Sequence, residues 1–539
     1  MGEPRTVEVR DMSGGVNFAK PAIRLKPNET DIQLNGWVRD EAYCKRPGLT
    51  KDTVNPLPDP IIDLVAYGWD IATNIFAGIF ATTFGRGLGG GSQTTGLYYK
   101  NSTARADFTI IPDVGSGFVT NDIYMIGKAI PVGANPGYAG ANGALMFYIS
   151  GAYAAAIVPN RSRYILQSST YLRIADVPAA TTQIYATSGA WHRGHLFTGY
   201  SQHGTYSRHS IWRSEYGKPE SFLATGTGAA EVPINPTGAT GLVLGIKSAG
   251  DTAYVMKADG IHWITGYDLT TFRYDRLPTE HGGCFSRAFA QIGAGLIGFS
   301  VTENGPDQNQ RNNLTLKTII SISGQSVVDI GGRVRSLLGM TVADEGCRVE
   351  YWSMKGLVLL IPTIGKTASD TQVLTAAATD IIVYDPTASA FWVWKVDKSC
   401  MAGAMTPHRN TIFLGCMDGH VRYFDETAAT DDGAAFDSYY AHSEISIVDK
   451  TIVADAITIY GTQTSGGMTS VSVSINGEAF REAGRVNLCD PKAPYGIKIS
   501  SIGLVDSAKR MRVKVTFPPD GVGCKYYGYD PAIKEQGRV

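Results

Sequence analysis

The sequence predicts a large all-β protein: a β-propeller of about six blades with a smaller β-sandwich-like platform domain. The chain of 539 residues holds 62 glycines and 25 prolines, at a density that would interrupt most helices. Short apolar runs recur between Gly, Asp, Asn and Pro, and no long helical period is found. Units of three or four such runs repeat along most of the chain, which is typical of propellers.

Composition and charge narrow the class of protein. Hydrophobic residues make up 43% of the chain, which is enough to build a core and excludes a disordered chain. The chain has 48 basic and 49 acidic residues, and no run of Lys or Arg is longer than two. A protein that holds nucleic acid tightly usually carries a basic excess, so tight binding to DNA or RNA is disfavoured while transient contact with DNA stays possible.

Tight turns between apolar runs predict the hairpins. Asp259-Gly260, Asp418-Gly419 and Asn476-Gly477 each separate two such runs, and these dipeptides favour hairpin turns because their residues accept positive φ. Asp385-Pro386 separates another pair of strands, at 381–384 and 391–394. Several strands also end in an aromatic residue followed by Asp, as at Phe424-Asp425.

The repeated units define the expected domains. Candidate blades lie near 61–100, 122–176, 192–222, 241–276, 293–330 and 349–397, and the hairpin at 411–425 is a further unit that could complete a blade. Residues 427–437 are rich in Ala, Thr, Asp and Gly and predict a linker. We therefore expect an extended arm at 1–50, the propeller at 51–430 and the platform at 431–539, and a closed ring would protect the strand edges.

The sequence contains few motifs that are typical of catalytic, cofactor or metal sites. We expect no cofactor, no metal and no catalytic residue, since neither a phosphate-binding loop nor a G-x-S-x-G elbow is present. His192 and His195 have a spacing that suits a metal on a helix, but their surroundings predict a strand, where the two side chains would point to opposite faces.

Other single features have ordinary interpretations. The seven cysteines show no C-x-x-C spacing and predict scattered, mostly buried thiols in a protein folded in a reducing cytosol. Residues 129–160 are uncharged but hold several Gly and Pro, so we expect strands and a loop there rather than a membrane span. Glu215 and Glu220, near Trp212 and Tyr216, would be the carboxylates of a glycan hydrolase; a solvated loop is the alternative.

The N-terminal segment carries the most specific pattern. It reads Ser13-Gly14-Gly15-Val16-Asn17, then Pro27-Asn28-Glu29, then Asn35-Gly36, then Lys45-Arg46-Pro47-Gly48. This order resembles the start of tail proteins from tailed bacteriophages, most closely the propeller-bearing nozzle or hub proteins of short-tailed phages. The segment Ile211–Phe222, with Trp212-Arg213-Ser214-Glu215-Tyr216-Gly217-Lys218-Pro219, is similar to a blade segment of these proteins.

The resemblance implies a structural role in the virion tail, with synthesis in the host cytoplasm. It implies a homohexamer docked below the adaptor ring of the portal, with a central channel for DNA and attachment sites for tail fibres or tailspikes. A channel lined with Lys and Arg would retain DNA, so we expect a neutral or acidic lumen. Two alternatives from the residues are a propeller glycan hydrolase or depolymerase, with two carboxylates in a cleft, and a carbohydrate-binding adhesin, with exposed aromatic residues and no paired acids.

The arm itself has a physical interpretation beside the resemblance. Two glycines permit a tight turn or a close backbone approach, and Arg46-Pro47-Gly48 would end an extended segment. We expect the arm to close the platform or to reach a neighbouring subunit; an ordinary edge strand is the alternative. The candidate subunit-contact residues are Gly14, Gly15, Asn17, Arg46, Pro47 and Gly48.

Overall fold

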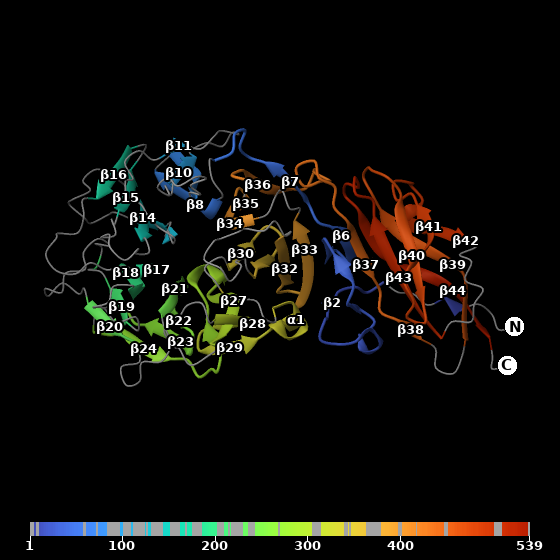
Figure 1. Ribbon diagram of the computed structural model, residues 1–539, viewed down its shortest axis with the longest axis horizontal. Coiled ribbons are helices and arrows are strands. Elements are labelled where there is room, and N and C mark those ends of the chain that lie inside the picture. Colours follow the sequence, from blue (N-terminus) through green and yellow to red (C-terminus); the bar gives the residue numbers. More distant parts are fainter. Residues whose placement is uncertain are drawn as a thin grey trace, which may run out of the picture.

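The computed structural model is an elongated all-β molecule with a propeller at one end and a platform at the other (Figure 1). It describes residues 5–6, 10–57, 61–71, 74–83, 97–100, 109–110, 124–125, 128–130, 144–150, 162–167, 170–174, 186–201, 210–213, 216, 230–234, 243–267, 270–303, 314–338, 343, 347–362, 379–396, 402–416, 418–446, 451–500 and 509–536. The helices in these residues are single turns: η1 (Ala22–Arg24), η3 (Ser286–Ala288), η5 (Gly331–Arg333), α1 (Arg335–Leu338) and η7 (Ala493–Tyr495).

The propeller consists of consecutive antiparallel sheets of the meander type. The first three sheets are β8 (Ile61–Ile71), β9 (Asn74–Thr83), β10 (Leu97–Lys100) and β11 (Thr109–Ile110); β12 (Tyr124–Met125), β13 (Lys128–Ile130), β14 (Ala144–Ser150), β15 (Ser162–Gln167) and β16 (Thr170–Ile174); and β17 (Ala186–His192), β18 (His195–Ser201), β19 (Ser210–Arg213) and β20 (Ala230–Pro233).

The next three sheets follow the same plan. They are β21 (Val243–Ala249), β22 (Thr252–Lys257), β23 (Gly260–Thr265) and β24 (Arg273–Arg276); β25 (Gly282–Gly283), β26 (Phe289–Ile292), β27 (Gly295–Glu303), β28 (Leu314–Ser323) and β29 (Ser326–Asp329); and β30 (Arg348–Trp352), β31 (Leu357–Ile361), β32 (Thr379–Asp385) and β33 (Ala390–Val396). These six sheets match the six candidate blades of the sequence.

A seventh sheet joins the two ends of the propeller. It contains β34 (Ala402–His408), β35 (Thr411–Cys416) and β36 (Val421–Asp425), and its outer strand is β7 (Gly48–Lys51) from the N-terminal segment. The described strands therefore form seven blade-like sheets, one more than the expected six. The hairpin at 411–425 becomes a full sheet because β7 pairs with β36 in the register Leu49 to Phe424.

Contacts between inner strands hold six of the seven borders between neighbouring propeller sheets. The inner strands in contact are β34 with β8, β8 with β12 and β13, β17 with β21, β21 with β26, β26 with β30, and β30 with β34. The contact between β34 and β8 brings the last sheet against the first. In the last sheet, the buried Arg422 side chain donates to both carboxylate oxygens of Asp418 and to Asp432, which also pairs with Lys51 of β7.

The platform is a sandwich of two six-stranded sheets. One contains β42 (Ile497–Ser500), β39 (Thr451–Thr462), β44 (Lys525–Gln536), β6 (Ala42–Lys45), β5 (Gly36–Arg39) and β1 (Arg5–Thr6). The other contains β4 (Gln33–Leu34), β37 (Ser438–Ala441), β43 (Arg510–Phe517), β40 (Thr469–Ile475), β41 (Arg481–Val486) and β38 (Ile445–Ser446). Four of these strands come from the N-terminal segment, which is thus part of the folded body rather than a separate arm at 1–50.

One apolar core runs from the platform into the last two blades. It contains Val471 and Val513 of the platform, Trp37 and Tyr43 of the N-terminal segment, and Trp394 of β33. Tyr43 stacks on Phe517 with ring centroids 6.0 Å apart. The platform and the adjacent blades therefore share buried surface and form one packed unit.

Most turns lie where their residues predict them. Asn476 and Gly477 have φ of 52° and 84° in the turn that follows β40, and Gly419 has φ of 81° between β35 and β36. The Asp259-Gly260 hairpin is present but shifted by one residue. Lys257 pairs with Gly260, so the turn is Ala258–Asp259 and Gly260 begins β23.

The platform core holds a fully buried histidine that links its two sheets. His442 follows β37, and its Nε2 atom lies 2.9 Å from the hydroxyl of Tyr526 on β44. Burial, together with the positive charge of Arg512, lowers the pKa of His442 to about 3. The imidazole is therefore neutral in the folded protein at any ordinary pH.

This histidine predicts acid destabilisation of the protein. Between pH 6.5 and pH 4 the unfolded chain binds a proton at His442 that the folded chain does not, so the free energy of unfolding falls as the pH falls. The slope from one such group approaches about 1.4 kcal/mol per pH unit. We expect His442→Phe to reduce the slope by about this amount in urea titrations at pH 4 to 6.5. An unchanged slope would show that His442 is protonated in the folded state.

Candidate functional site at the propeller–platform junction

The N-terminal segment lies between the propeller and the platform and caps the outer edge of β33. Gln33 and Asn35 accept hydrogen bonds from the backbone of this strand: Val393 N–H donates to Gln33 Oε1 at 2.8 Å and Lys395 N–H to Asn35 Oδ1 at 2.6 Å. The backbone N–H of Asn35 donates to Val393 O at 2.8 Å. A free strand edge invites pairing with other chains, and here it is covered by side chains of the same chain.

Arg46 is the centre of the junction. Its side chain is fully buried, and its guanidinium lies 3.7 Å from the centre of the Phe436 ring. All five N–H groups donate hydrogen bonds at 2.6 to 3.0 Å, to Asn35 Oδ1, Pro47 O, Lys395 O and the two carboxylate oxygens of Asp431. An arginine has five donors, so none is left over. Arg46 thus binds the N-terminal segment, the outer strand of a blade and the linker to the platform together.

The start of the segment docks on the fifth and sixth blade sheets. Gly15 has φ of 65°, and a Cβ atom there would lie 2.6 Å from the Phe391 carbonyl oxygen, so the backbone needs glycine. Arg333 donates to the Gly14 carbonyl at 2.6 Å. Asn17 is buried, and its backbone N–H donates to Thr30 O at 2.7 Å.

Glu29 is the buried carboxylate of this docking region. Burial alone would raise its pKa, but hydrogen bonds from Lys26 N–H and Asn17, with the charges of Lys20 and Arg333, hold the pKa of Glu29 below its usual range. It therefore stays ionised, and it links the segment to Arg333 of the propeller at an N–O distance of 3.7 Å. Through Glu29, the Pro27-Asn28-Glu29 motif therefore links the N-terminal segment to the propeller.

The structure corrects the expected role of the six subunit-contact residues. Pro47 is buried, and the buried Gly48 donates to the Ala428 carbonyl at 2.9 Å. All six are buried within one chain: Gly14, Gly15, Asn17, Arg46, Pro47 and Gly48. Buried residues have no surface to offer a neighbouring subunit. The other expectation, that the segment closes the platform, is confirmed by the pairing of β6 with β44 and of β4 with β37.

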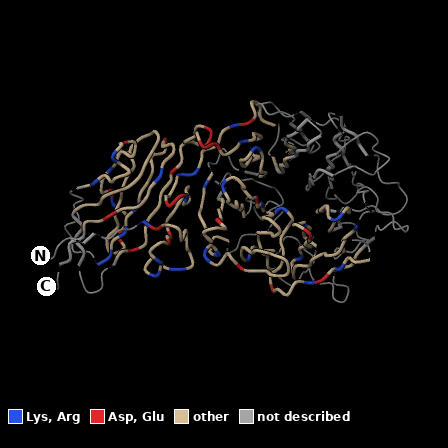
Figure 2. Tube along the Cα trace, turned by 180° about the vertical axis from the view of Figure 1, so that it is seen from behind, with Lys and Arg blue, Asp and Glu red and all other residues tan. Residues whose placement is uncertain are grey.

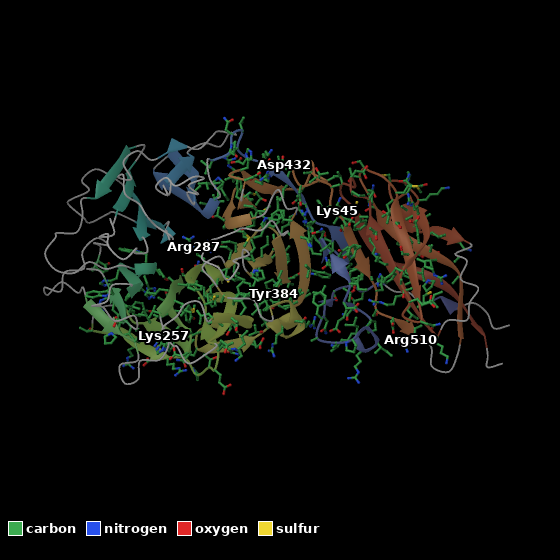
Figure 3. The ribbon with its side chains drawn as sticks, in the orientation of Figure 1. Lys45, Lys257, Arg287, Tyr384, Asp432 and Arg510 are labelled. Carbon is green, nitrogen blue, oxygen red and sulfur yellow. The ribbon has the colours of Figure 1, made fainter. Side chains whose placement is uncertain are left out.

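A cavity of about 120 Å³ lies beside this junction, among residues from all three parts of the chain. It is lined by Trp37, Arg39, Cys44, Lys45, Arg46, Pro47, Lys355, Glu426, Ala428, Gly521, Val522, Gly523, Cys524 and Lys525. Figure 3 shows Lys45 and Asp432 where the N-terminal strands pass between the propeller and the platform. Five of the lining side chains are cationic and one is acidic, and Asp431 and Glu426 pair with two of these cations.

Burial sets the protonation and hydrogen bonding of three side chains that line the cavity. The Lys45 ammonium donates to four carbonyls at 2.6 to 3.3 Å, those of Ala429, Pro518, Pro519 and Gly521. Burial lowers the pKa of Lys45 to about 8, but these carbonyls occupy its protons. Burial raises the pKa of the Cys44 thiol to about 11 and that of Cys524 to about 12, so neither is a thiolate at neutral pH.

The paired histidines behave differently from the expectation. His192 and His195 are direct cross-strand partners across the two-residue turn Arg193–Gly194, so they do not point to opposite faces of one strand as expected. The reason is that the chain reverses between them. His192 Nδ1 lies 3.2 Å from Ser248 Oγ, and His195 packs edge-on against Phe272. Within the described ranges, no three His, Cys, Asp or Glu side chains gather as metal ligands.

Other residues singled out from the sequence are placed as follows. Glu215 and Glu220 lie outside the described residues, so the hydrolase hypothesis stays untested. Trp212 is buried, whereas Tyr216 is 68% exposed. Of the six cysteines in the described part of the chain, Cys489 is exposed and the other five are buried. No described helix has the length and apolar character that crossing a membrane requires.

Sequence reasoning missed part of the junction. Gln33 and Asp431 were not singled out from the sequence. Gln33 donates to the Gly36 carbonyl of the N-terminal motif, and Asp431 accepts from Arg46. Asn35 was noted as part of a motif, and its φ of 57° is a conformation that Asn tolerates better than most residues. The partner of a buried arginine can stand far away in the sequence, as Asp431 does, and no local pattern identifies it.

Charge is spread evenly over the described residues. Figure 2 shows basic and acidic residues interspersed along the trace of both domains. This mixture agrees with the net charge of −1 of the whole chain. An electrostatic footprint for tight DNA binding would instead be a continuous basic patch.

The chain is similar to several solved structures, each at low sequence identity. No protein family model matches the chain, and no characterised protein matches its sequence. The computationally designed Ika8 protein matches at 10% identity with a TM-score of 0.35, covering 69% of this chain and 99% of its own. BamB from Moraxella catarrhalis matches at 10% identity and a TM-score of 0.33, covering 74% and 95%.

An exo-β-1,3-galactanase from Phanerochaete chrysosporium matches at 8% identity and a TM-score of 0.24, covering 86% of this chain and 95% of that enzyme. Similarities this low support no transfer of function. The propeller architecture described above rests on the strand pairing of this chain itself.

Proposed function

We propose that the chain is a structural virion protein, a subunit of the tail nozzle or hub ring through which phage DNA leaves the particle. The observation that carries the proposal is the structural role of the N-terminal motif residues. The N-terminal residues that resemble tail nozzle proteins include the ones that join the propeller to the platform, Gly15, Asn35 and Arg46. The motif residues thus determine how the two domains are joined, which is the role expected of such a motif in a structural protein.

The rigid connection between the domains supports the same proposal. A tail subunit must keep its shape while partners bind at both of its ends. The shared core, the capped edge of β33 and the fully bonded Arg46 fix the two domains in one body. A hinge between the domains, by contrast, would need an exposed linker with few contacts.

The charge distribution is compatible with a channel that passes DNA without holding it. Each phosphate contact by Lys or Arg releases counterions and adds affinity, which would slow DNA passage. The proposed ring is a homohexamer docked on the portal adaptor and bearing tail fibres or tailspikes, with a neutral or acidic lumen. A continuous basic lumen in the assembled ring would contradict this arrangement.

Purified phage particles test the proposal. We expect quantitative mass spectrometry of density-gradient-purified virions to find about six copies of the chain per particle, as a single homohexameric ring requires. Treatment with a protease that removes loosely attached host proteins serves as the control. A chain that is present in infected cells but missing from the particles would refute a structural role in the virion.

A further inference from the structure

Two exposed tyrosine rings flank one tight turn on the propeller, at the border of the third and fourth sheets. The turn is Arg193–Gly194 between β17 and β18, with φ of 48° and 79°. Tyr216 is 68% exposed and Tyr267 is 70% exposed. Tyr216 follows β19, and Tyr267 lies between β23 and β24.

Each ring is supported on one side by the turn. A Cβ atom on Gly194 would lie 2.3 to 3.0 Å from three ring carbons of Tyr216, so the ring covers the glycine directly. The Arg193 guanidinium carbon lies 4.3 Å from the centre of the Tyr267 ring. Since both tyrosines are mostly exposed, the sides of the rings away from the turn face solvent.

Polar groups accompany the rings and hold them in place. Arg193 Nη2 lies 2.6 Å from Asp251 Oδ1, and the Asp251 side chain is 80% exposed. Tyr267 N–H donates to Thr271 Oγ1 at 3.0 Å, which fixes the loop that carries the ring. The ring of His195 packs at 71° to that of Tyr216, at a centroid distance of 5.5 Å.

From this arrangement we infer that the turn and its two tyrosines form a binding site for a polysaccharide chain. The face of an aromatic ring is electron-rich and attracts the weakly positive C–H groups of a pyranose ring. The charged pair of Arg193 and Asp251 offers donors and acceptors to the hydroxyl groups. A long glycan suits two separate open rings on an outer surface, whereas a small molecule would need an enclosed pocket.

A protein partner fits the same surface less well. Interface centres are enriched in Tyr and Arg but depleted of Asp, and here the mostly exposed carboxylate of Asp251 lies beside the two rings. The choice of a bacterial surface glycan as the occupant rests on the proposed function, whereas the sugar-binding arrangement of the two rings does not. The inference assigns this face of the propeller to contact with a cell-surface glycan.

An array of purified bacterial polysaccharides tests the inference with labelled full-length protein. O-chains of lipopolysaccharide and capsular polysaccharides occupy separate spots, which distinguishes the two sources, and purified outer-membrane proteins occupy others. We expect retention on polysaccharide spots, and about tenfold weaker binding for Tyr216→Ala and for Tyr267→Ala, since one ring contact of this kind contributes about that factor. Tyr216→Phe and Tyr267→Phe keep the ring and should bind as the unaltered protein does.

The control is Tyr495→Ala, which removes a tyrosine that is 86% exposed on the platform and should leave binding unchanged. Three results would overturn the inference. These are retention on no polysaccharide spot, retention on outer-membrane proteins alone, and equal binding by the two alanine variants and the unaltered protein. The alanine variants change exposed side chains, and circular dichroism verifies their folding.

Discussion

Replacing Arg46 by alanine is expected to lower the free energy of unfolding by about 3 to 5 kcal/mol, because it leaves a buried carboxylate without its counter-charge. Asp431 is fully buried, and the guanidinium of Arg46 holds both of its carboxylate oxygens, at 2.8 and 2.6 Å. The substitution also removes the donors to Pro47 O and Lys395 O. Urea unfolding followed by tryptophan fluorescence measures the loss, because Trp394 and Trp392 lie in the adjoining core.

Two further variants separate charge from geometry at this position. Arg46→Lys keeps the positive charge but has three donors instead of a planar set of five, so it should recover only part of the loss. The matched control is Arg485→Ala, which breaks an exposed ion pair with Glu482 and should leave the free energy of unfolding nearly unchanged. Equal losses for Arg46→Ala and Arg485→Ala would mean that Arg46 does not hold the domains together.

The second large effect is expected for Trp394→Ala, at about 3 to 5 kcal/mol. The Trp394 side chain is fully buried and lies in the core that joins the sixth blade to the platform. Its ring centroid lies 5.6 Å from that of Trp37 and 5.5 Å from that of Phe424, and its Nε1 donates to Gly36 O at 3.0 Å. Removing the ring opens a cavity where β33, the N-terminal segment and the last blade meet.

The same experiment reports on the coupling of the domains. A shared core predicts that the platform and the adjacent blades unfold together, so calorimetry of the unaltered protein should not separate the platform from them. Trp394→Ala should lower this transition, whereas Tyr495→Ala, which alters an exposed aromatic residue, should change it by less than about 0.5 kcal/mol. A Trp394→Ala protein that unfolds like the Tyr495→Ala protein would contradict the shared core.

Features encoded by neighbouring residues could be predicted from the sequence. The hairpins around Asp418-Gly419 and Asn476-Gly477 form where expected, because positive φ at a turn depends on the turn residues themselves. The six candidate blades also match six sheets, because each is a meander of consecutive strands. His192 and His195 show the limit of this reasoning: they were assigned to one strand, and the two-residue turn between them was overlooked.

Features that join distant segments could not be predicted in the same way. Strand β7 completes a blade whose other strands begin at Ala402. No sequence pattern near Gly48 indicates that β36 is its pairing partner. Arg46 was singled out, but its bond to Asp431 spans 385 positions of the chain. Of the two roles that the sequence suggested for the N-terminal segment, closing the platform is confirmed by the strand pairing, whereas the burial of its key residues within one chain does not fit contact with another subunit.

The tail function remains the central proposal, and one view of the assembled particle tests it most directly. Cryo-electron microscopy of the virion tail should show a ring of six copies at its distal part, surrounding a central channel, with the propeller and the platform of each copy fitted as one rigid body. A particle whose tail contains no density for this chain, or a chain that stays monomeric and apart from the tail, would contradict the proposal.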